Sequence, residues 1–536
     1  MFRIHRATLL FSAATLVFQL VPVVEGFGQR DASKAQANKS KSLVTISKET
    51  TFFTKPLTDS GFVDYSRAIN ERMGQGVTPQ NNANVLFWQA LGPAPSKTVM
   101  PAKFFQSLGI ASPPKQGDYF LELTEYIEQR LRITHADAKY SQIIDHQGQA
   151  SERPWKTGQF PQIMAWIQAN EKPLALVVAG TKREKYFSPL AIADGQTGVA
   201  GTLISALLPA IQQARNFARA LTARAMWHTG AGRNSEAWED LLTVHRLGRL
   251  IGQGPTIIEA LVGIAIDGMV TEADLAFVER TQPDARLARK YLADLAALPA
   301  LPNMADKIDL TERCMFLDLT QMLTREGVAD LGQLVGRGEN VAGVLSKLAT
   351  SVIDWNITMQ TGNAWYDRLT GAMRIADRQQ RKLAFAKIDQ DLKSLSGKAK
   401  GITQGLRLLL ATNKTRGKTM GEILVALLLP AAANAQQAED RGLQRQANLR
   451  VAIALAGYRT QHGTYPESLK RLAPDMLKQI PTDLFAGKPL NYRRTSDGYL
   501  LYSIGPNEQD DGGRYYNDDP RGDDSRVRMP LPPVKD

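Results

Sequence analysis

The chain has 536 residues, of which 43% are hydrophobic and 22% are charged. That length predicts two or three hydrophobic cores, and the composition excludes both a membrane-embedded bundle and a disordered chain. The formal net charge of +12 is spread over many segments, and short basic runs such as residues 378–382 are not interleaved with aromatic residues. We therefore expect no nucleic acid partner.

The N-terminal segment is typical of an export signal. Two arginines precede an apolar run over residues 7–20, and a break follows at residues 22–26. This order predicts that residues 1–26 are a Sec-type signal peptide and that the body is exported, to the periplasm or the extracellular space. Residues 24–26 lack the small-x-small pattern of a cleavage site, so an uncleaved anchor over residues 7–24 stays open. A membrane is a partner only in that case.

A flexible linker and a helical body are predicted next. Residues 27–49 are rich in Ser, Lys, Gln and Ala without periodicity, which is typical of a linker. Short helices separated by Pro and Gly then lead to a sub-boundary near residue 195. The single cysteine, Cys314, has apolar neighbours and is interpreted as a buried structural thiol.

The central region shows the clearest helical periodicity. Apolar residues step by three or four from Leu203 to Ala225 and predict one long helix. A glycine turn at residues 230–232 leads into a returning helix, and a third helix is predicted from Thr256 to Val278. These segments predict antiparallel helices, and the pattern stays helical as far as residue 405.

A helix followed by a small sheet is predicted near the C-terminus. Five residues that share one face mark the helix: Leu443, Ala447, Val451, Ala454 and Tyr458. Gly463 ends this helix, and a Tyr465-Pro466 turn leads into a second short helix. Two strands are predicted at residues 490–493 and 499–503, joined by a turn that contains Gly498.

One string of motifs in this region resembles a known family. It comprises Tyr458, Gly463-Thr464-Tyr465-Pro466, Leu469, Leu472, Pro481-Thr482-Asp483, Phe485, Gly487-Lys488-Pro489-Leu490, Tyr492, Gly498-Tyr499 and Tyr502-Ser503-Ile504-Gly505-Pro506. The string resembles the soluble domain of the major pseudopilin of type II secretion, and it is similar to the C-terminal part of a group of large exported bacterial proteins. The resemblance implies a small α+β module. In a pilus subunit, a long apolar helix directly follows a processed junction, which Gly26-Phe27 resembles. Because the apolar run of this chain precedes Gly26-Phe27 instead of following it, we do not expect a pilus subunit.

Aspartates crowd the segment after the predicted strands. Hard oxygen ligands at this density suit calcium, which takes about six to eight oxygens. The resemblance implies the same ion, because the major pseudopilin holds calcium in the loop after its Tyr-Ser-x-Gly strand. Carried over by position, the ligands are Asp510, Asp511, Asp518 and Asp519. The insertion Arg514-Tyr515-Tyr516 departs from the family pattern, and a solvated acidic tail is the alternative.

The sequence contains no common catalytic motif. It has no His-x-x-x-His or Cys-x-x-Cys pair, no P-loop, no dinucleotide glycine signature and no Gly-x-Ser-x-Gly. The best acid/base candidates are four residues of the central helices: Glu239, His245, Glu259 and Asp267. Carboxylates on an apolar helix can mark function or can pair with nearby arginines, and we favour structural pairing.

These predictions define a mainly α protein with a small C-terminal α+β domain. The predicted division is a signal peptide at 1–26, a linker at 27–49, a helical body at 50–410, a linker at 411–420, a pseudopilin-like module at 421–506, and an acidic loop and tail at 507–536. The expected function is that of an exported structural or interaction protein with protein partners and no catalytic or cofactor-binding residues. An exported hydrolase that uses the four central residues is the alternative.

Overall fold

The computed structural model describes residues 44–95, 98–192, 201–206, 208–327, 352–399 and 411–533. It is mainly helical with a small antiparallel sheet near the C-terminus, which confirms the predicted fold class. The predicted signal at residues 1–26 lies outside the described residues. Among the residues within those ranges, no helix has both the length and the apolar character that crossing a membrane would require.

Short helices form the first part of the body. They are α2 (Tyr65–Met73), α3 (Ala83–Leu91), α4 (Ala102–Ser107), α5 (Leu123–Gln129), α6 (Ala138–Glu152), α7 (Pro161–Ala169) and α8 (Glu171–Thr181). Large aromatic side chains fill the space between them, and Trp88, Trp155 and Trp166 are all buried. Helices α3 and α8 pack closely because Gly180 lies against the ring of Phe87, where an added Cβ would be 2.7 Å from the nearest ring carbon.

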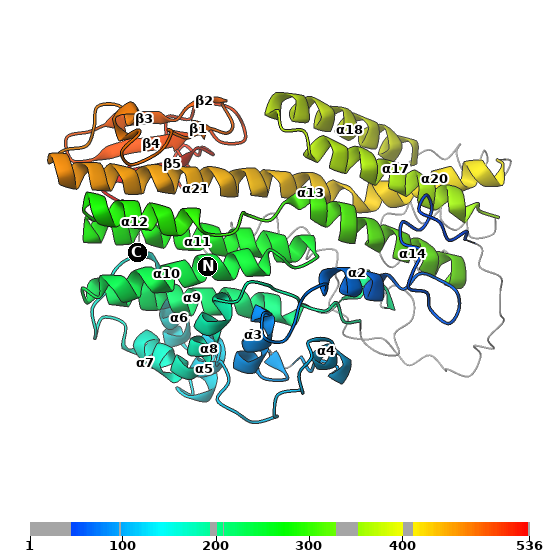
Figure 1. The fold of residues 1–536 in the computed structure, drawn as a ribbon, viewed down its shortest axis with the longest axis horizontal. Coiled ribbons are helices and arrows are strands. Elements are labelled where there is room, and N and C mark those ends of the chain that lie inside the picture. Colours follow the sequence, from blue (N-terminus) through cyan, green and yellow to red (C-terminus); the bar gives the residue numbers. More distant parts are fainter. Residues whose placement is uncertain are drawn as a thin grey trace.

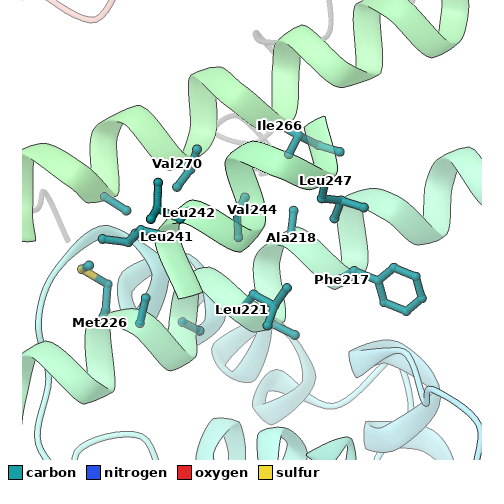
Figure 2. Close-up of a cluster of buried hydrophobic side chains, with 14 of the residues drawn as sticks. Phe217, Ala218, Leu221, Met226, Leu241, Leu242, Val244, Leu247, Ile266 and Val270 are labelled. Atoms are coloured by element: carbon teal, nitrogen blue, oxygen red, sulfur yellow. The ribbon is translucent and has the colours of Figure 1, made fainter. Parts of the chain in front are cut away.

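Antiparallel helices form the centre of the molecule. They are α9 (Pro209–Gly230), α10 (Asn234–Ile251), α11 (Ile257–Thr281) and α12 (Ala285–Ala296). Apolar side chains from α9, α10 and α11 meet in one core, including Leu221, Val244 and Ile266 (Figure 2). The prediction of one helix from Leu203 is wrong at its start, because residues 203–205 form the separate 3₁₀ turn η4 (Leu203–Ser205). The helix begins at Pro209 because proline disfavours helical geometry in the residue before it.

Helices α10 and α11 approach each other backbone to backbone. An added Cβ on Gly263 would lie 2.4 Å from the carbonyl oxygen of Gly248, so only glycine fits at this crossing. Thr256 and Glu259 form a reciprocal capping box that starts α11. This close crossing brings polar side chains on the two helices within hydrogen-bond reach of one another.

A further group of helices continues the body. It contains α13 (Met304–Lys307), the π-helical turn η5 (Ile308–Glu312), α14 (Arg313–Glu326), α17 (Trp355–Met373), α18 (Arg378–Ala399) and α20 (Asn413–Leu428). The predicted linker at 411–420 therefore lies mostly in helix α20, which Thr412 caps by accepting a hydrogen bond from the N–H of Thr415 at 3.3 Å. Two small residues explain the packing, since an added Cβ on Gly417 or Gly421 would lie 2.2 or 2.8 Å from carbonyl oxygens in and before α17.

The predicted linker at 27–49 also ends in packed structure. Val44 is buried, and the N–H of Thr45 donates to Oδ1 of Asn356 at 2.8 Å. The side-chain amide of Asn363 on α17 donates to the carbonyl oxygens of Glu49 and Thr50 at 3.0 and 2.9 Å. Residues 44–50 are therefore held against α17.

The C-terminal part consists of one long helix and a small sheet. The helix is α21 (Pro430–His462), which ends at Gly463 with φ +75° as expected, and the 3₁₀ turn η6 (Leu469–Leu472) follows. A two-stranded ribbon pairs β1 (Thr482–Asp483) with β2 (Lys488–Pro489). The main sheet has the order β3 (Asn491–Arg494), β4 (Tyr499–Ser503) and β5 (Ser525–Met529), all antiparallel. Strand β5 was missed because the segment 507–536 was expected to be an acidic loop and tail.

Helix α21 lies between the sheet and the helical body (Figure 1). Leu449, Val451 and Ile453 are buried on different sides of the helix, and one hydrophobic core joins them to α9, α10 and α11 and to Tyr499 and Leu501 of the sheet. Leu443, which was expected on the buried face, is 44% exposed. The helix is buried nearly all round over this stretch because it packs against two layers, so a single apolar stripe does not describe it.

Candidate functional site

The acidic loop joins β4 to β5 and lies at residues 504–524. Gly505, Gly512 and Gly513 have φ of +71°, +69° and +79°, a conformation that favours glycine. An added Cβ on Gly505 would lie 2.3 Å from the carbonyl oxygen of Asp523, so the two ends of the loop touch. The loop is therefore folded back on itself.

The structure brings one of the four predicted calcium ligands into a cluster. Asp511 lies with Asp523 and Asp524, and one carboxylate oxygen from each can be chosen so that all lie within 4.8 Å of one another. Asp510 instead accepts from the N–H of Gly512 at 2.8 Å, while Asp518 pairs with Arg526. Asp519 is exposed. Asp523 and Asp524 belong to the same acidic stretch, and only the return of β5 to the sheet places them beside Asp511.

Backbone N–H groups hold the cluster, which we call the acidic triad (Asp511, Asp523 and Asp524). The N–H of Gly513 donates to Oδ2 of Asp524 at 2.7 Å, and the N–H of Asp523 donates to Oδ2 of Asp511 at 3.1 Å. The N–H of Asn507 donates to Oδ2 of Asp523 at 3.0 Å. Oδ1 of Asp523 is buried and has no hydrogen-bond partner in the described part of the chain.

Burial and mutual repulsion disfavour the ionised carboxylates of the triad. Burial raises the pKa of Asp524 to about 6 against the opposing backbone hydrogen bonds, and the charges of Asp511 and Asp510 add to the rise. Burial, together with the charge of Asp511, also raises the pKa of Asp523. Carboxylates that repel one another in this way are stabilised by a cation, and oxygen ligands of this kind suit calcium.

The hydrolase candidates lie on α10 and α11, and two of them meet. Nδ1 of His245 and Oδ1 of Asp267 are 2.8 Å apart, and Nε2 of His245 lies 2.8 Å from Oδ2 of Asp274. Arg249 donates to Asp267 at 2.9 Å, and Nε2 of Gln446 on α21 donates to the other oxygen of Asp267 at 2.7 Å. The side chains of the histidine, the arginine and the two aspartates are at most 5% exposed. We call these five residues the ion network.

The charges of the ion network compensate one another. Burial alone would lower the pKa of His245, but Asp274 and Asp267 outweigh it and raise this pKa to about 9. Burial would raise the pKa of Asp267, but His245 and Arg249 outweigh it and hold that pKa below its usual value. The histidine is therefore a cation at neutral pH, and two cations face two carboxylates.

The other two hydrolase candidates lie apart from the network. Glu239 is 45% exposed and pairs with Arg246 at 3.0 Å, whereas Glu259 is buried and accepts from Oγ1 and the N–H of Thr256. Pairing with arginines, the favoured interpretation, is confirmed for Asp267 and Glu239. Two of the pockets formed by the described residues have volumes of about 850 and 630 Å³ and are open to solvent, and none of the four candidates lines either of these cavities.

Two further sequence features have structural roles. Cys314 is buried, and burial raises the pKa of its thiol well above the ordinary value, which confirms the prediction of a structural thiol. The basic run at residues 378–382 begins α18 and contacts the C-terminal part of the chain. Arg381 donates to Asp440 of α21 at 3.1 Å, and Lys382 pairs at 2.6 Å with Glu508, which also pairs with Arg378. This run therefore has partners within the chain.

In comparisons with known proteins, no family model, no curated protein and no solved structure matches the chain.

Proposed function

We propose that the chain is an exported, non-catalytic structural or interaction protein that works through its C-terminal module and whose acidic loop is stabilised by calcium. The export part of the proposal is supported by the apolar run at residues 7–20 and its flanks. The resemblance to the pseudopilin domain supports the module, together with the paired strands β3 and β4 after helix α21. The proposed partners are proteins.

The non-catalytic part of the proposal rests on the contacts and positions of the candidate acids and bases. Their side chains contact one another, arginines or a helix cap, and they line neither of these two cavities, although Oε1 of Glu259 has no hydrogen-bond partner among the described residues. A general base has to reach a substrate proton directly or through one water molecule. Glu259 keeps one feature of a general acid, because burial raises its pKa to about 7, but it lines neither cavity.

The calcium part is supported by the acidic triad. Three carboxylates from two separate parts of one loop converge, and one buried oxygen of Asp523 lacks a hydrogen-bond donor in the described residues. This set revises the ligands predicted by position, because Asp523 and Asp524 stand in place of Asp510, Asp518 and Asp519. Calcium binding would tie Asp511, within the loop, to the residues that lead into β5.

Thermal unfolding of the full chain tests the calcium part. We expect calcium to raise the melting temperature and EDTA to reverse the rise, because a ligand that binds only the folded state adds about 2.7 kcal/mol at a hundred times its dissociation constant. The double variant Asp511→Asn/Asp523→Asn should lose this response, and Asp475→Asn, an exposed aspartate outside the loop, should keep it. An identical transition in calcium and in EDTA would refute calcium stabilisation.

Cell fractionation tests the export part. The full chain, expressed in a Gram-negative bacterium, should be released with the periplasm or found in the medium, and a chain without residues 1–26 should stay in the cytoplasm. Retention of both chains in the cytoplasm would rule out export while leaving the calcium result unaffected.

A further inference from the structure

A cavity that is widely open to solvent lies where the N-terminal segment meets α14 and α17. Its volume is about 630 Å³, and Lys48, Phe52, Arg313, Asn363 and Asp367 are among the residues that line it. Neither the acidic triad nor the ion network borders it. The cavity is therefore separate from the features on which the proposed function rests.

Two irregular stretches of backbone converge on this cavity. Phe52 has φ +61°, and the N–H of Phe53 donates to the carbonyl oxygen of Thr51 at 2.5 Å, which closes a γ-turn around Phe52. The π-helical turn η5 ends immediately before Arg313. A positive φ is rare for a bulky residue, and π-turns inside helices frequently occur at functional sites. Strain of this kind persists only where the surrounding contacts enforce it.

The guanidinium of Arg313 is the best-fixed group of the cavity. Its side chain is 3% exposed, and its Cζ lies 4.8 Å from the centre of the Phe52 ring. Nε donates to the carbonyl oxygen of Asp309 at 3.2 Å, and Nη1 donates to the carbonyl oxygen of Asn363 at 3.3 Å. These contacts, made from the π-turn and from α17, orient the planar group.

Two carboxylates contact Nη2 of Arg313, and they differ in exposure. Oδ1 of Asp309 lies 2.5 Å away and Oδ1 of Asp367 lies 2.7 Å away. Asp309 is 25% exposed and also accepts from Arg374, whereas Asp367 is 70% exposed. Asp309 thus holds the guanidinium from outside the cavity lining, whereas Asp367 lines the cavity and reaches the guanidinium from the solvent side. A carboxylate dissolved in water can approach along the same side.

We propose that this cavity binds a small molecule that carries a carboxylate, and that the ligand replaces Asp367 on Arg313. The chain itself shows which chemistry the guanidinium accepts here, since the exposed group on it is a carboxylate. Arginine suits carboxylates because its planar fork matches their two oxygens. Lys48 supplies a second, exposed cation at the rim, beside the exposed carboxylate of Glu49, and Phe52 supplies apolar surface for the rest of the ligand.

Calorimetric titration of the full chain with succinate at constant ionic strength tests this proposal. Asp367→Asn removes the internal competitor and should bind succinate about tenfold more tightly than the natural chain, because a competing state that occupies the site lowers the apparent affinity. Asp389→Asn is the control, because Asp389 on α18 is similarly exposed, and it should leave the affinity for succinate unchanged. Absent, unchanged or weaker binding by Asp367→Asn would overturn the proposal.

Further variants locate the anion. Adding Arg313→Lys to Asp367→Asn, with folding checked by circular dichroism, should abolish succinate binding, because lysine keeps the charge but loses the fork. Should the buried lysine unfold the chain, Lys48→Gln on the Asp367→Asn background replaces it as the test, since Lys48 is on the surface. That variant should weaken binding several-fold, and an unchanged affinity would place the anion elsewhere and contradict the assignment. Calcium dependence plays no part in these titrations, so their failure would leave the proposed function untouched.

Discussion

The ion network and the acidic triad both collect aspartates, but they balance the negative charge differently. In the network, two buried aspartates meet His245 and Arg249 at 2.8 to 2.9 Å, and an amide from α21 adds a hydrogen bond. In the triad, three aspartates meet one another, and an exposed arginine contacts one of them at 3.5 Å. The two cations and the two carboxylates of the network cancel in charge, whereas the triad keeps a negative charge that an external cation can compensate. We therefore expect the two regions to respond oppositely to mutation, pH and calcium.

Removal of His245 should have the largest effect. His245→Ala leaves two buried aspartates with one cation, and breaking a buried pair in this way costs about 3–5 kcal/mol of the free energy of unfolding. Urea denaturation of the full chain measures the loss. His462→Ala, at an exposed position near the end of α21, is the matched control and should change stability by less than about 0.5 kcal/mol. A loss below about 1 kcal/mol for His245→Ala would mean that the network is not held by charge.

Alkaline pH should have the second-largest effect, because it weakens the ion network. The pKa of His245 is raised from 6.5 to about 9 in the folded chain. A raised histidine pKa stabilises the fold fully below pH 6.5, and the stabilisation disappears as the pH rises through about 9. The difference in unfolding free energy between the natural chain and His245→Gln should shrink by ~3 kcal/mol from pH 6 to pH 10. A constant difference would show that His245 is neutral in the folded protein.

Loss of the contact from α21 should have a smaller effect. Gln446→Leu removes the amide that donates to Asp267 at 2.7 Å, and hydrogen bonds to charged groups contribute about 1.5–3 kcal/mol. Gln461→Ala changes an exposed glutamine on the same helix and should be nearly neutral. Chemical denaturation compares the two variants. Equal stabilities would indicate that packing alone holds α21 on the body.

The acidic triad should show the smallest effect, and its response to pH should depend on calcium. In EDTA, the raised pKa of Asp524, about 6, means that protonation favours the folded state, so the loop gains stability as the pH falls from 7 to 5. Bound calcium holds the carboxylates ionised, so this gain disappears and the stability stays nearly constant over the same interval. Hydrogen exchange of residues 505–524 at pH 7 and pH 5 measures both responses. The same trend in calcium and in EDTA would contradict ion binding at the triad.

Local patterns predicted the long C-terminal helix and the strands around Gly498. The αL end at Gly463 and the pairing of β3 with β4 follow from residues adjacent in sequence, and both agree with the prediction. The signal for β5 was also present, because Val527 and Met529 alternate with arginines before a proline. The acidic residues around that segment led to its interpretation as a tail.

Distant contacts decided the features that the patterns missed. Residues 411–420 look polar in isolation, but their glycines let α20 pack against α17, and this contact favours a helix over a linker. Leu443 has helical spacing with buried residues, yet it is 44% exposed, whereas its neighbours Gly442 and Gln444 face the helical body and the segment after β1. The basic run at 378–382 looks like a surface for anionic partners, but Asp440 and Glu508 of the C-terminal part neutralise it.

By itself, the sequence determined the mainly helical class, the end of α21 and the presence of acidic residues on α11 and after β4, because these depend on residue type and short-range spacing. Tertiary structure alone decided the charge state of those acids. His245 and Arg249 reach Asp267 because glycines allow α10 and α11 to touch, and Asp511 meets Asp523 because β5 returns to the sheet. The energy of a buried charge depends on partners a few ångströms away in space, and spacing along the chain does not report them.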